Sequence, residues 1–106
     1  MKIDEFREVL RKRSTLHPND DFETEKCWRK EVAILSEDIN GTISYLQNEC
    51  TDDEYSWISE IIDDLIEVTR SKELLYCYKS LMNKFPVACE TYNIAFSIEC
   101  AEALLE

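Results

Sequence analysis

The residues that could do chemistry in this chain are few and widely separated. Its single histidine, His17, stands directly before Pro18 and has no nucleophilic residue next to it. Because a general base must lie within hydrogen-bond reach of the group it activates, we interpret His17 as a loop residue. Two thiols, Cys89 and Cys100, recur on similar faces of one expected helix, but a zinc site needs further ligands. The five cysteines, which form no C-x-x-C pair, are interpreted as core residues without disulfides: Cys27, Cys50, Cys77, Cys89 and Cys100.

Motifs for metals and phosphates fail in the same way. The Glu-x-x-His signature of di-iron bundles is missing, because no Glu stands three residues before His17. A calcium loop at Asp52 would place Trp57 where the loop needs glycine. The only glycine, Gly41, cannot build a glycine-rich phosphate loop. We therefore predict a protein that is not an enzyme, with no catalytic residues, no metal and no cofactor.

Carboxylates are the one chemical group present in excess. The chain carries a net charge of -11, and the segment from Glu31 to Thr69 contains eleven acids and neither Lys nor Arg, whereas acids and bases balance elsewhere. Such a block predicts a negative potential on one side of the fold. Nucleic acids and anionic membranes, being polyanions, are disfavoured as partners. A basic partner is the natural complement, although a charge run can also be only a solvated face.

The acids after Cys50 recur at helical spacing on the side opposite an aliphatic stripe. We expect Tyr55 either in the core or at an interface, where tyrosine is favoured. Trp57 is assigned to the core, and Tyr76 is a candidate for exposure. The predicted partner-binding residues are Asp52, Asp53, Glu54, Tyr55, Glu60, Asp63, Asp64 and Glu67.

The elements that must position these residues are predicted to be about five helices in one all-α bundle, forming a single domain over residues 1–106. The apolar periodicity predicts helices from about Ile3 to Arg13, from about Phe22 to Cys50, from a cap at Thr51 or Asp52 to Thr69, from a cap at Ser71 to Phe85 where Pro86 stops it, and from about Val87 to Leu105. The second helix is interpreted as one continuous helix, straight or bent, and a turn at Asn40-Gly41 is the alternative. The charged N-terminal segment and the absence of a long apolar run predict a cytoplasmic protein.

The segment from Trp57 to Pro86 resembles a family of small all-helical immunity proteins from contact-dependent growth inhibition and related bacterial polymorphic toxin systems. The matching features lie along half the chain: Trp57, Glu60, Asp63 with Asp64, Thr69, Ser71 and Phe85-Pro86, with weaker support from Trp28-x-x-Glu31 and Asp38-Ile39-x-x-Thr42. The resemblance implies a protein that binds the C-terminal toxin domain of a CdiA-type effector, commonly a nuclease, in a stoichiometric complex.

The acidic block agrees with this implication, since a nuclease presents a basic cleft to phosphates. We therefore expect an immunity protein that occludes a basic toxin, and charge reversal at Glu60 together with Asp64 should weaken binding while leaving the fold intact. The alternative is a helical scaffold or regulatory adaptor that receives a partner helix in an apolar groove. Binding by such an adaptor would depend little on salt.

Overall fold

A computed structural model describes all residues from 1 to 106 and contains only helices. The helices are α1 (Ile3–Thr15), α2 (Asp21–Glu37), α3 (Ile39–Asn48), α4 (Asp52–Ile58), α5 (Ile62–Thr69), α6 (Lys72–Ser80), a 3-10 turn η1 (Leu81–Asn83), α7 (Pro86–Tyr92) and α8 (Ile94–Ala103). The all-α class is confirmed. The expected number of about five helices is wrong, because three of the expected helices are interrupted.

The expected second helix is broken at Asp38, three residues before Gly41. Asp38 leaves helical geometry with φ -139° and ψ 88°, and its carboxylate accepts a hydrogen bond from the backbone N–H of Gly41 at 3.1 Å, which caps the start of α3. A side chain that caps a new helix competes with continuation of the old one. Neither the continuous helix nor the turn at Asn40-Gly41 is correct, and Gly41 lies inside α3.

The expected third helix is divided by the tight turn Ser59 to Ile61. Its start is confirmed, because Thr51 and Glu54 form a reciprocal capping box. At its other end the backbone N–H groups of Ser59, Glu60 and Ile61 each bond three residues back instead of four, which closes α4 with a 3-10-type turn. The turn places Glu60 outside both helices, where its carboxylate meets Arg13 of α1 and Trp28 of α2.

Two further differences from the expected helices lie in the C-terminal half. In the expected fourth helix, the α-helical part ends at Ser80 and the chain continues as the 3-10 turn η1. Pro86 therefore does not stop this helix. It occupies the first turn of α7, where its missing N–H is not needed. The expected fifth helix is divided at Asn93, whose φ of 50° is left-handed. Asn is one of the few residues that adopt this conformation at a helix end.

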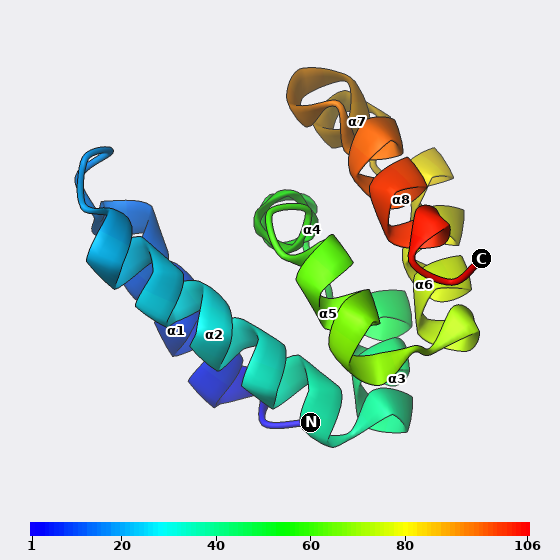
Figure 1. The fold of residues 1–106 in the computed structure, drawn as a ribbon, viewed down its shortest axis with the longest axis horizontal. Coiled ribbons are helices and arrows are strands. Elements are labelled where there is room, and N and C mark those ends of the chain that lie inside the picture. Colours follow the sequence, from blue (N-terminus) through cyan, green and yellow to red (C-terminus); the bar gives the residue numbers. More distant parts are fainter.

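Three groups of helices follow one another across the molecule (Figure 1). The α1–α2 hairpin forms one side, α4 and α5 lie in the middle, and α6, α7 and α8 form the other side. In agreement with this arrangement, α5 packs against both α2 and α8, α4 packs against α7, and α3 packs against α6. The two helices that carry the middle of the acidic block therefore lie between the two outer groups.

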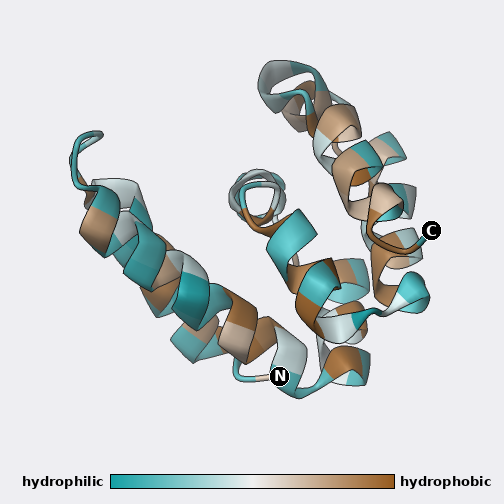
Figure 2. Cartoon of the chain, viewed as in Figure 1, coloured by the Kyte–Doolittle hydropathy of each residue, from teal (hydrophilic) through white to brown (hydrophobic).

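One contiguous core of 22 buried residues joins these groups. Apolar and polar residues alternate around each helix, and α8 is apolar over much of its length (Figure 2). At the centre, the rings of Tyr55 and Tyr78 stack at 4.3 Å between centroids. Each tyrosine hydroxyl donates to the backbone carbonyl of the other residue at 2.9 Å, so both buried hydroxyls are satisfied.

Candidate functional site

Glu54 stabilises the fold through hydrogen bonds and is not a free surface carboxylate. Its carboxylate accepts hydrogen bonds from Arg7 Nε at 2.8 Å, from the Tyr45 hydroxyl at 2.9 Å and from the Thr51 N–H at 3.2 Å. Burial opposes ionisation of Glu54, but these donors outweigh it and hold its pKa below the ordinary value. This predicted binding residue anchors α1 to the start of α4.

Glu60 has a similar structural role. Its carboxylate receives two hydrogen bonds from Arg13, at 3.1 and 2.7 Å, and one from the indole Nε1 of Trp28 at 3.2 Å. The Arg13 guanidinium also lies 5.1 Å from the centroid of the Trp57 ring. Glu60 thus ties α1 and α2 to the α4–α5 turn, so reversal of its charge would disturb the fold as well as any binding surface.

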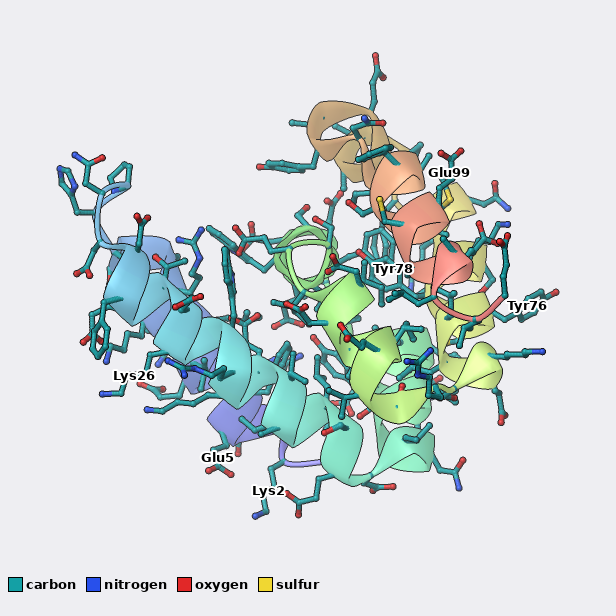
Figure 3. The ribbon with its side chains drawn as sticks, viewed as in Figure 1. Lys2, Glu5, Lys26, Tyr76, Tyr78 and Glu99 are labelled. Atoms are coloured by element: carbon teal, nitrogen blue, oxygen red, sulfur yellow. The ribbon has the colours of Figure 1, made fainter.

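Tyr55 is a core residue, not a binding residue. Its side chain is fully buried in the stack with Tyr78, so the interface alternative for Tyr55 is wrong. The sequence contained a signal for this, because Tyr55 stands three residues before buried Ile58 and therefore shares its helical face. Trp57, assigned to the core, is only partly buried and packs against the core beneath Arg13. Tyr76 is exposed as expected, and Figure 3 shows it pointing outward while Tyr78 of the same helix points inward.

The basic residues of the N-terminal segment neutralise part of the acidic block. Arg7 and Arg13 pair with Glu54 and Glu60 across 47 positions of sequence. The N-terminal ammonium pairs with Asp38 at 3.1 Å, and Lys2 lies 3.8 Å from Glu37. Glu31 is buried. The exposed acids of the block that form no salt bridge are Glu49, Asp52, Asp53, Asp63, Asp64 and Glu67.

Five of the eight predicted binding residues therefore stay exposed and unpaired, in two clusters. Asp52 and Asp53 occupy the first turn of α4, where the helix dipole favours negative charge. Asp63 and Asp64 occupy the first turn of α5, and Glu67 follows one turn later. Burial, followed by repulsion from Asp63 and Glu67, raises the pKa of Asp64. None of these three carboxylates forms a salt bridge that would offset the repulsion.

The second cluster borders a cleft of about 360 Å³ between α2 and α5. From α5 it receives Asp64, Glu67 and Val68, and from α2 it receives Glu25, Trp28, Arg29 and Val32. The three carboxylates outnumber the one cation, Arg29, and together with the indole and the two valines they can accept the charged head and the apolar stem of an Arg or Lys side chain. The sequence did not predict the α2 residues, because Glu25 and Arg29 lie before the base-free block.

A larger groove of about 690 Å³ runs between α1 and α2. Its lining includes Val9, Cys27, Ala33 and Ile34 together with basic and acidic residues in similar numbers, among them Lys2 and Glu5. Figure 3 labels Lys2 and Glu5. This groove is where a partner helix would lie in the adaptor hypothesis. Its mixed rim offers no preference for a basic partner.

The remaining candidates for chemistry are dispersed. His17 is exposed in the loop after α1 and accepts a hydrogen bond from the Asn19 N–H through Nδ1 at 3.1 Å. All five cysteines are free, and no group of three or more His, Cys, Asp or Glu side chains is arranged to hold a metal ion. None of the helices combines the length and the apolar character needed to cross a lipid bilayer.

Comparison with known protein families, with curated proteins and with solved structures finds no match to this chain. The fold and the surface therefore define its class only as a small, acidic, all-α protein with an acidic interhelical cleft. The resemblance to immunity proteins stays a prediction.

Proposed function

We propose that this protein is an immunity protein that binds and neutralises a basic toxin domain, the C-terminal nuclease of a CdiA-type effector being the expected class. The observation that carries the proposal is the α2–α5 cleft, where Asp64 and Glu67 are exposed, unpaired and beside Trp28. The cleft would receive a basic side chain that the toxin otherwise uses to bind phosphate. Inhibition by occlusion requires no catalytic group in the inhibitor.

The charge of the cleft also supports a fast association. Exposed carboxylates on a chain with net charge -11 attract a basic domain from a distance, and such steering raises the association rate at low salt. An Arg or Lys that enters the cleft would relieve the repulsion among Asp63, Asp64 and Glu67. Binding would then lower the pKa of Asp64, in the direction opposite to the shift found in the free protein.

Reversal of two cleft charges tests this proposal. The partner would be the basic C-terminal domain of the protein encoded immediately upstream, purified as an inactive variant, and binding would be followed by surface plasmon resonance at several salt concentrations. We expect Asp64→Lys with Glu67→Lys to slow association strongly and to reduce its salt dependence. The matched control is Glu90→Lys with Glu99→Lys, which changes the net charge equally at exposed positions outside the cleft.

The control variant should bind nearly as wild type does. Equal losses in both variants would mean that net charge matters and the cleft does not. If the cleft variant bound the toxin domain with unchanged affinity and still protected cells from the toxin, the cleft would be excluded as the binding site. Salt-independent binding that is lost only on substitution of Val9 or Ile34 in the α1–α2 groove would favour the adaptor instead.

A further inference from the structure

Glu31 is a carboxyl group enclosed within the fold without a partner. It lies on the inward face of α2 with Cys27 and Leu35, its exposed fraction is 0%, and neither side-chain oxygen forms a hydrogen bond. Acidic side chains are almost never fully buried unless they are paired. A group that costs stability in this way calls for a role other than packing.

The neighbouring charged groups explain why Glu31 is unpaired. Arg13 from α1 and Glu60 from the α4–α5 turn both act on its charge, and Cys27 is the titratable neighbour on its own helix. Arg13, however, already donates two hydrogen bonds to Glu60, and Glu60 also accepts from Trp28. The only cation close to Glu31 is therefore committed to a second carboxylate.

Both its burial and the nearby carboxylate of Glu60 favour the neutral form of Glu31. Burial, followed by repulsion from Glu60, raises the pKa of Glu31 to about 8, and attraction by Arg13 only partly opposes this. Glu31 is therefore mainly protonated at neutral pH. Ionisation would place two carboxylates beside one guanidinium in an enclosed space, where their repulsion is poorly screened.

We propose that Glu31 is a protonation-dependent latch: its neutral form lets the α1–α2 hairpin close on the α4–α5 turn, and its ionisation opens that junction. Trp28 and Val32, which flank Glu31 along α2, line the cleft between α2 and α5. Opening of the latch therefore changes the width of the cleft. The inference concerns the protein alone and does not depend on the proposed toxin partner.

The two tryptophans make the latch observable, because Trp28 bonds to Glu60 and Trp57 lies beneath Arg13. The experiment records tryptophan fluorescence from about pH 6 to about pH 9, together with the carbon NMR signals of ¹³C-labelled glutamate side chains. In wild type we expect a reversible emission change with a midpoint near pH 8, coincident with titration of the Glu31 carboxyl. Faster amide exchange in α2 and the α4–α5 turn should accompany it.

Glu31→Gln and Glu31→Leu should both abolish the emission change, whereas the exposed control Glu37→Gln and the thiol control Cys27→Ala should keep it. If one of the two Glu31 variants fails to fold, the other variant and the NMR titration of the wild type still test the latch. A Glu31 carboxyl that titrates with the exposed glutamates overturns the inference. Titration of the Glu31 carboxyl near pH 8 without any change in tryptophan fluorescence or amide exchange would also overturn it. An emission change that persists in both Glu31 variants would overturn it as well.

Discussion

Removal of the charge of Glu60 should destabilise the fold even though a quarter of its side chain is exposed. Glu60→Gln keeps the size of the side chain but replaces one acceptor oxygen by an amide, so the paired bonds from Arg13 cannot both be retained. Hydrogen bonds to charged groups contribute roughly 1.5–3 kcal/mol, and the exposure of Glu60 (26%) and Arg13 (19%) reduces the effect. We expect a loss of about 2 kcal/mol, or roughly 10 °C in Tm for a chain of this size.

Urea denaturation of wild type and variant at neutral pH would measure the loss, and a double-mutant cycle with Arg13→Gln would isolate the pair. The control Asp63→Asn removes an exposed charge without a salt bridge and should change stability by less than about 0.5 kcal/mol. A Glu60→Gln variant as stable as that control, with no coupling to Arg13, would refute the structural role of Glu60 and return it to the candidate binding surface.

Three further predictions concern the core and one helix junction. Burial raises the pKa of Glu31 to about 8 in the folded state, whereas in the unfolded chain this carboxyl ionises above its ordinary pKa of 4.5. Raising the pH from about 5 to about 7 should therefore lower the free energy of unfolding of the wild type by about 2.5 kcal/mol relative to Glu31→Gln. Parallel pH profiles from urea denaturation would contradict this. Tyr55→Phe should cost about 1–2 kcal/mol in the same assay, since the buried carbonyl of Tyr78 loses its donor; a neutral effect would mean that water replaces the bond. Gly41→Ala should lower Tm, because a methyl group there would collide with the Asp38 carboxylate that caps α3; a rise in Tm, as expected for Ala in an open helix position, would show that the cap is dispensable.

The division of the surface between folding and binding changes how the acidic block is understood. Taken as a sequence, the block is uniform, and each acid is an equal candidate for a basic partner. In the structure, Glu54 and Glu60 are held by arginines of α1, whereas Asp64 and Glu67 form no salt bridge and border a cleft that also contains Arg29. Mutagenesis of the block should therefore treat these two groups separately, because only the second group can report on binding without also reporting on stability.

Local chemistry in the sequence was enough to predict the all-α class, the cap at Ser71, a cap at either Thr51 or Asp52, and most of the inward faces. These features depend on residues within one or two turns of each other, where spacing fixes which side chains share a face. The break at Asn93 had a usable signal of the same kind, since Asn tolerates the left-handed conformation. The break at Asp38 was harder to predict, because the apolar spacing continues across it without a change of phase.

Only the tertiary structure determines which acidic side chains remain available to bind a partner. Arg7 and Arg13 meet Glu54 and Glu60 across 47 positions, and the cleft joins residues of α2 to residues of α5. Periodicity along one helix says which side chains face inward, but it does not say which distant side chain meets them there. Glu31 illustrates the reason. In the sequence it is one of eleven acids in the block, whereas in the structure it is buried near Arg13 of α1 and Glu60 of the α4–α5 turn, which raises its pKa.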